Sequence, residues 1–145
     1  GCPICLMHMQ GEPSTMQRDP RYTDVVREVK EWLSDRVADA VLAGIRHENI
    51  LLDPGYGFGK TVVHNLEMLR RQRELCDLGF PLVAGWSRKS TIGTVLGGAS
   101  ADDRLEGTAA CVTLSIANGA AIVRVHDVKE MARVARMTDA VVRSR

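Results

Sequence analysis

Short apolar runs alternate with amphipathic stretches along the whole chain. The apolar runs cover residues 3–9, 50–52, 81–84 and 121–125. Apolar residues recur at helical spacing over 24–42, 64–75, 87–96, 102–118 and 128–141. The runs show little internal alternation, which predicts strands that are covered on both faces. A strand-then-helix order predicts parallel strands joined by helical crossovers, so we expect an α/β protein of about four βα units.

Composition narrows the class of protein without identifying it. The 145 residues include 19 Lys and Arg against 18 Asp and Glu, and 45% are hydrophobic. This balance disfavours a nucleic-acid partner, and no apolar run approaches the roughly 18 residues that a membrane span needs. The first residues show no signal peptide, and the four cysteines are too scattered for a disulfide scaffold. We therefore expect a cytoplasmic protein with no membrane partner.

The unusual polar residues gather directly after the predicted strands. They are His8, Asp53, the segment 87–90, and Arg124 with His126. Loops at the carboxyl ends of parallel strands carry the sites of both doubly wound sheets and (β/α)8 barrels, but four consecutive contributing loops are more typical of a barrel. A complete TIM barrel takes about 250 residues, so this chain has room for half of one. A half barrel leaves two open strand edges, which predicts either a missing N-terminal half or intimate pairing with another chain.

The segment from Asp53 to Thr61 is a glycine-rich loop that follows a buried strand. Its Gly-Lys-Thr ending suggests a phosphate-binding P-loop, but that pattern requires glycine where Pro54 stands. Asp53 opens the loop at the mouth of the sheet. Its carboxylate can accept two hydrogen bonds from an amino-heterocycle, or it can cap the loop by bonding the loop backbone. The spacing favours the two interpretations equally.

Two further loops carry cations. Residues 85–90 place hydroxyls and basic side chains at the start of a short helix, which suits an anion site or, alternatively, a helix cap with solvated basic residues. Arg124 and His126 are two residues apart and so share a strand face, where they suit a phosphate or diphosphate. The alternative is a structural Arg–Asp pair with His126 as a local cap. Asp127 is predicted to cap the last helix.

Cys2 and Cys5 have the spacing of redox and zinc motifs. A redox motif should follow a strand and open a helix, and zinc would need two more ligands that the sequence does not offer. We therefore predict that both are buried structural cysteines.

Taken together, these motifs resemble dihydropteroate synthase, an enzyme family of folate biosynthesis. The matching stretches are CLMHMQG (5–11), LLDPGYGFGK (51–60), GWSRKSTIG (85–93) and RVHDV (124–128). They occur in the family's order and spacing over essentially the whole chain. Tyr56 stands where phenylalanine is common, and Trp86 where other apolar residues are frequent.

The resemblance implies a transferase that joins 7,8-dihydropterin-6-ylmethyl diphosphate to p-aminobenzoate and releases diphosphate. It implies that pterin is bound by Asp53, Lys89, Met7, Gly85 and Arg124. Diphosphate would be bound by Arg124 and His126, and p-aminobenzoate by Phe58, Ser90 and Lys89. No covalent nucleophile is implied. Sulfonamides would compete with p-aminobenzoate.

The resemblance also implies a Mg²⁺ cofactor and a homodimer. Residues 1–145 would form strands five to eight of the family barrel, with the N-terminal half absent. The family's metal-binding Asn would lie in that half, so no metal ligand is expected in this chain. We expect the 145 residues alone to bind substrate weakly. The competing interpretations are a non-catalytic half barrel that pairs with another chain, and a Rossmann-type phosphate-binding protein.

Overall fold

A computed structural model describes residues 1–143 of the chain. Its four strands are β1 (Ile4–Met7), β2 (Ile50–Asp53), β3 (Val83–Ala84) and β4 (Ile122–Val123). β1 pairs in parallel with β2, and β3 pairs in parallel with β4. A parallel bridge between Leu52 and Leu82 joins the two pairs, so the strands follow one another in chain order. All four predicted strands are confirmed, although β3 and β4 are only two residues long.

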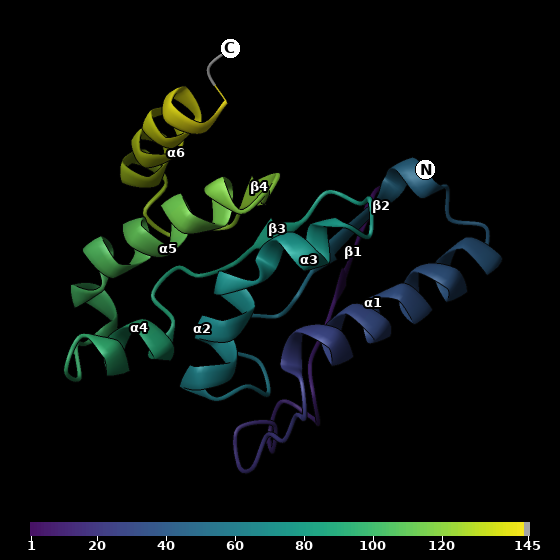
Figure 1. The fold of residues 1–145 in the computed structure, drawn as a ribbon, viewed down its shortest axis with the longest axis horizontal. Coiled ribbons are helices and arrows are strands. Elements are labelled where there is room, and N and C mark those ends of the chain that lie inside the picture. Colours follow the sequence, from purple (N-terminus) through teal and green to yellow (C-terminus); the bar gives the residue numbers. More distant parts are fainter. Residues whose placement is uncertain (144–145) are drawn as a thin grey trace.

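The helices are α1 (Val25–Leu42), α2 (Val62–Arg70), α3 (Gln72–Cys76), α4 (Ser90–Val95), α5 (Leu105–Ala117) and α6 (Val128–Val142). Short 3-10 turns precede β2 and α5, at His47–Asn49 and Ala101–Asp103. In Figure 1, α1 lies on the right, α2 and α3 lie near the middle, and α4, α5 and α6 lie on the left. α1 packs on α2 and α3, α2 on α4 and α5, and α5 on α6.

The helices cover one face of the β1–β2 pair. Ile50 and Leu52 are fully buried in the main core, and Leu6 packs against them, whereas Cys5 points to the opposite face and is exposed. The prediction of strands covered on both faces is therefore wrong for β1 within the part of the chain that the structure describes. A sheet with helices on one face agrees with a half barrel and not with a doubly wound sheet. The prediction that Cys2 and Cys5 are buried is also wrong, because both side chains are exposed.

Two hydrophobic clusters support the fold. The larger one lies between β1 to β3 and helices α1 to α4, and it includes Leu33, Met68 and Trp86. The smaller one, around Val112, Ile116 and Met131, lies between α5 and α6. Across residues 1–143, no helix has the length and apolar character that a membrane crossing demands.

The predicted helix over 64–75 is interrupted at Arg71, which separates α2 from α3. The Arg71 guanidinium binds Glu74 and reaches Asp24, the residue whose carboxylate caps α1. Directly after the break, Gln72 is fully buried; it accepts a hydrogen bond from the Tyr56 hydroxyl and donates one to the carbonyl of Ser115. The interruption therefore coincides with polar contacts to distant segments, which helical periodicity does not reveal.

Candidate functional site

The loop between β2 and α2 lies directly on the segment that follows β1. Gly55, Gly57 and Gly59 all have positive φ angles, of 69°, 78° and 59°. A Cβ atom on Gly55 would lie 1.8 Å from the carbonyl oxygen of His8, and one on Gly59 would lie 2.4 Å from that of Gln10. Only glycine permits this approach together with these backbone angles. The backbone of the loop therefore packs directly against the backbone that follows β1.

Asp53, the last residue of β2, is buried at the mouth of the sheet, with 3% of its surface exposed. Its Oδ1 accepts the Gly55 N–H at 2.8 Å, and its Oδ2 lies 3.7 Å from Nη2 of Arg124. One oxygen thus caps the loop, as one of the two interpretations predicts, while the other lies toward Arg124; binding of an amino-heterocycle stays a prediction. Burial raises the pKa of Asp53, and the Gly55 N–H and the charge of Arg124 partly offset that rise.

Lys89 is a second cationic residue, after Arg124, near the end of β2. Its Nζ lies 3.9 Å from the centroid of the Phe58 ring, a cation–π contact. A Cβ on Gly57 would lie 2.9 Å from the Lys89 side chain, so the loop backbone leaves room for it. Burial and, next, the charge of Arg124 lower the pKa of Lys89, while the charge of Asp53 opposes them. Asp53, Phe58, Lys89 and Arg124 therefore form one group, which we call the strand-end cluster.

Arg124 follows β4, and its N–H extends the pairing by bonding the carbonyl of Ala84 at 3.0 Å. Its guanidinium crosses Gly85, where a Cβ would lie 2.8 Å from Nη2. The missing side chain at position 85 is what lets Arg124 reach Asp53. The Arg124 side chain is 60% exposed, which leaves donors free for an added anion.

His126 is anchored by Ser87. The buried Ser87 Oγ accepts the His126 backbone N–H at 3.1 Å and lies 2.9 Å from Nδ1 of the ring. The Ser87 hydroxyl can either donate to Nδ1 or accept from it, so this contact fixes the orientation of the exposed ring and not its tautomer. Among residues 1–143, no hydrogen bond joins His126 to the strand-end cluster.

Arg88 organises the loop between β3 and α4. It has a φ of 58°, and it is the one non-glycine residue with positive φ in the part of the chain described. Its guanidinium binds both oxygens of Asp127, at 3.2 and 2.7 Å, and also Asp102. Asp127 is at the N-cap of α6, but its carboxylate serves Arg88 and makes no cap bond, so the predicted side-chain cap is wrong. Arg88, and not Arg124, therefore pairs with Asp127, while Arg124 lies beside Asp53.

The remaining predicted residues lie around this group. Met7 is half-buried and aligned with Asp53 in the β1–β2 register. Ser90 is exposed and is the first residue of α4, adjacent to Lys89. Sequence reasoning missed Ser87 and Arg88 as positioning residues, and it missed Lys60, which is buried beneath the glycine-rich loop. Lys60 directly follows Gly55, Gly57 and Gly59, and this position at the end of the glycine-rich loop was the one sequence signal for its role.

The fold and the strand-end cluster define a class: an α/β protein with parallel strands whose carboxyl ends carry one buried carboxylate and two cationic side chains. The family model for pterin binding enzymes matches residues 1–126. The chain belongs to this family, as the resemblance predicts.

Known proteins refine the comparison. Dihydropteroate synthase from Neisseria meningitidis serogroup B is 51% identical over 140 residues, covering 94% of this chain and 49% of its own length. The Yersinia pestis dihydropteroate synthase structure with a sulfonamide drug superposes with a TM-score of 0.93 at 40% identity, covering 96% of this chain and 50% of that one. The Xanthomonas albilineans enzyme with 4-aminobenzoic acid gives 0.88 at 40% identity, covering 96% and 49%. The chain thus spans about half the length of these relatives.

Proposed function

We propose that this chain forms strands five to eight of a dihydropteroate synthase barrel, with residues 1–145 as part of its pterin-binding domain. Three observations support the proposal. The four strands are parallel and follow chain order. Within residues 1–143, β1 pairs only with β2 and β4 only with β3, so each keeps one edge open to a further strand. The matched relatives are about twice as long.

The strand-end cluster carries the proposal for substrates, 7,8-dihydropterin-6-ylmethyl diphosphate and p-aminobenzoate. The buried Asp53 carboxylate offers Oδ2 to the amino-pyrimidine edge of a pterin, with Met7 and Gly85 lining the slot. Lys89 supplies a donor to the acceptor side of the ring. Phe58 and Ser90, which flank Lys89, receive p-aminobenzoate or a competing sulfonamide.

The proposed reaction is a substitution at the pterin methylene carbon. The amine nitrogen of p-aminobenzoate forms a bond to that carbon, the carbon–oxygen bond breaks, and diphosphate leaves with the electron pair. The amine then loses a proton. Charge that develops on diphosphate is stabilised by the free donors of Arg124 and by the imidazole ring of His126. The arylamine is neutral, so catalysis rests mainly on positioning, and no covalent intermediate is required.

Magnesium stays a proposal for the complete enzyme. Among residues 1–143 there is no group of three or more His, Cys, Asp or Glu side chains placed to hold a metal ion. None of the steps above depends on a metal ion.

A fusion enzyme tests the function. The chain is joined to the remainder of the Neisseria protein, in place of the region it matches. We expect this fusion to release diphosphate only when both substrates are present. Arg124→Ala should raise KM for the pterin diphosphate by about 30-fold, equivalent to about 2 kcal/mol, and leave KM for p-aminobenzoate nearly unchanged. Diphosphate release is the measurement.

Arg27→Ala is the matched control, because Arg27 is exposed on α1 away from the cluster. Equal effects of Arg124→Ala on both substrates would contradict the assigned role. A folded fusion that releases no diphosphate would support a non-catalytic half barrel that only pairs with another chain.

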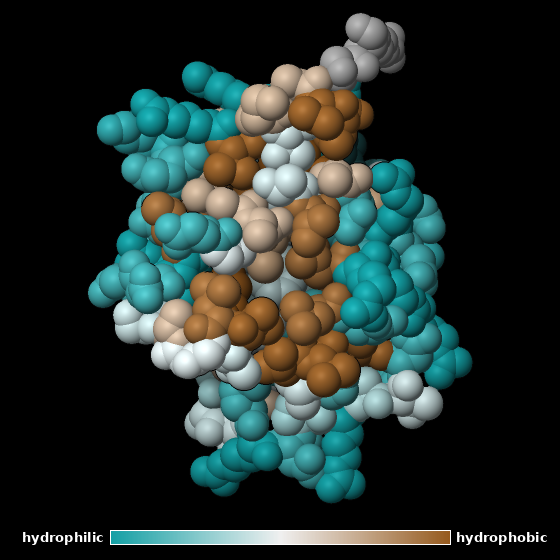
Figure 2. Space-filling model, turned by 60° about the vertical axis from the view of Figure 1, so that its left-hand side comes forward, coloured by the Kyte–Doolittle hydropathy of each residue, from teal (hydrophilic) through white to brown (hydrophobic). Residues whose placement is uncertain are grey.

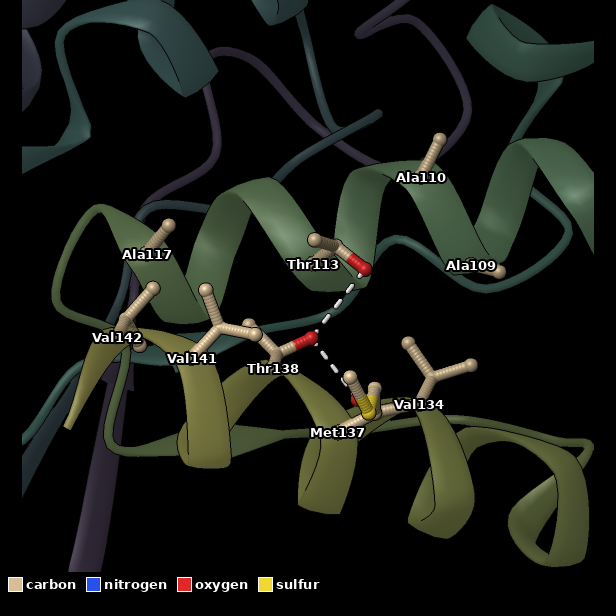
Figure 3. A pocket seen from close by; sticks show the side chains of 9 residues that line it. All are labelled: Ala109, Ala110, Thr113, Ala117, Val134, Met137, Thr138, Val141 and Val142. Carbon is tan, nitrogen blue, oxygen red and sulfur yellow. Dashed lines mark hydrogen bonds between the residues drawn. The ribbon is translucent and has the colours of Figure 1, made fainter. Parts of the chain in front are cut away.

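We further propose that the complete protein is a homodimer that pairs through α5 and α6. An apolar groove of about 430 Å³ runs between these helices (Figure 3), lined by Ala109, Ala110, Thr113, Ala117, Val134, Met137, Thr138, Val141 and Val142. Figure 2 shows apolar side chains gathered over one face of the molecule. Met137 and Val141 are each 67% exposed beside this groove. A groove and exposed apolar side chains on one surface suit two-fold self-association.

Sedimentation equilibrium of the fusion tests the pairing. We expect a dimer for the unchanged protein and a monomer for Met137→Glu with Val141→Glu, because two charges would be buried without partners. Val63→Glu is the control, since Val63 is 73% exposed on α2, outside the groove. A monomeric unchanged protein would refute the proposal.

A further inference from the structure

Lys60 lies beneath the glycine-rich loop and takes no part in the proposed chemistry. Only 3% of its surface is exposed. Its Nζ lies 2.9 Å from Nδ1 of His8, 3.1 Å from the carbonyl oxygen of Gly55 and 3.0 Å from that of Phe58. These three partners come from the end of β1 and from both sides of the loop. The side chain therefore ties the loop to itself and to the neighbouring strand.

The number of donors matches the number of acceptors. A protonated lysine has three N–H groups, and here each has one acceptor. His8 is buried against Trp32 and Tyr22, and burial followed by the charge of Lys60 lowers its pKa to about 3, so the ring is neutral and its Nδ1 can accept. A neutral amine has two N–H groups and one lone pair. Loss of a proton from Lys60 therefore removes one of its three donations, and the contact with His8 persists only if the ring proton moves to Nδ1.

The loop that Lys60 holds carries the aromatic ring of the proposed p-aminobenzoate site. Phe58 uses its backbone carbonyl to accept from Lys60 and its ring to contact Nζ of Lys89. Asn65 fixes the other side of the loop by accepting the Gly57 N–H at 2.7 Å. The position of the Phe58 ring therefore depends on the backbone that Lys60 binds.

Four titratable groups face Lys60 from the surrounding elements: His8 after β1, Asp53 on β2, His64 on α2 and Lys89 before α4. Burial lowers the pKa of Lys60 to about 7; the charge of Asp53 opposes this shift and that of Lys89 adds to it. The protonation state of Lys60 thus changes near neutral pH.

We propose that Lys60 is a positioning residue whose ammonium group, through the carbonyls of Gly55 and Phe58 and through His8, sets the Phe58 ring for p-aminobenzoate. The inference rests on the proposed function for its substrate. The protonation of Lys60 would thus affect the binding of p-aminobenzoate and not that of the pterin diphosphate.

The kinetic test uses the full chain within the Neisseria fusion. KM for p-aminobenzoate should rise roughly fivefold from pH 6 to pH 8, the size expected for one lost hydrogen bond, while KM for the pterin diphosphate changes little. Lys60→Met should show the higher KM for p-aminobenzoate at both pH values. Lys129→Met, at an exposed position on α6, is the control. A Lys60→Met enzyme with an unchanged KM for p-aminobenzoate, or with the same pH dependence as the unchanged enzyme, would overturn the proposal.

A second measurement does not depend on activity. Fluorophenylalanine labelling of the fusion gives ¹⁹F signals that include Phe58 and Phe80, and the signal that a Phe58→Tyr variant loses is that of Phe58. The Phe58 signal should shift between pH 6 and pH 8 in the unchanged fusion and lose that transition in Lys60→Met. Persistence of the transition in Lys60→Met would assign it to Lys89 or His64 and overturn the proposal. A fusion without activity that still shows the Lys60-dependent shift would refute the proposed function alone.

Discussion

Gly55→Ala should destabilise the protein by about 3 kcal/mol or more. Positive φ alone costs an alanine about 1 kcal/mol. The larger part comes from the methyl group, whose position would be 1.8 Å from the carbonyl oxygen of His8. This neighbour is backbone at the end of β1, so the loop must move away, and the bonds from Lys60 to His8 and Gly55 would be strained or lost. The free energy of unfolding from urea denaturation is the measurement.

Gly79→Ala is the control that separates the steric clash with His8 from the free-energy cost of a positive φ angle. Gly79 has a φ of 82°, close to the 69° of Gly55, and a Cβ there would meet nothing within 4 Å. We expect this control to lose only about 1 kcal/mol. Similar losses for the two variants would mean that the loop does not lie against β1 as closely as the structure indicates.

Sequence patterns predicted the elements that depend on local information. The apolar period over 24–42 predicted α1, which runs from Val25 to Leu42. The positions of Asp53 and Arg124 after strands predicted their meeting, because the ends of parallel strands share one edge of a sheet. Strand-end chemistry can be predicted in this way when the order of the elements is clear.

Features that depend on distant contacts could not be predicted. The helical period runs through Arg71 without a break, and only its pairing with Asp24, 47 residues away, distinguishes that position. The positive φ of Arg88 has no local signal, since that conformation is held by hydrogen bonds to Thr108 and from Arg104. Lys60 was considered only as part of a P-loop pattern, whereas its partner His8 lies 52 residues earlier.

Acid should destabilise the fold through His8. Burial is the main cause that lowers the pKa of His8 from 6.5 to about 3, so the folded protein keeps the ring neutral where the unfolded chain takes up a proton. The unfolded state then binds more protons between these two pH values, and stability falls as the pH falls. The expected slope is about 1.4 kcal/mol per pH unit, with a total loss on the order of 4 kcal/mol by pH 3. Urea denaturation at pH 6.5, 5.5 and 4.5 measures the slope.

His8→Asn isolates this contribution, because asparagine keeps an acceptor for Lys60 but does not titrate. Asp53 acts in the opposite direction, since burial raises the pKa of its carboxyl and the folded state then holds its proton more readily as the pH falls. The relevant quantity is therefore the difference between the two proteins. The unfolding free energy of the unchanged protein should fall faster than that of His8→Asn by about 1 kcal/mol per pH unit. Parallel slopes would mean that His8 is charged in the folded protein, and the donor and acceptor match around Lys60 would then be lost.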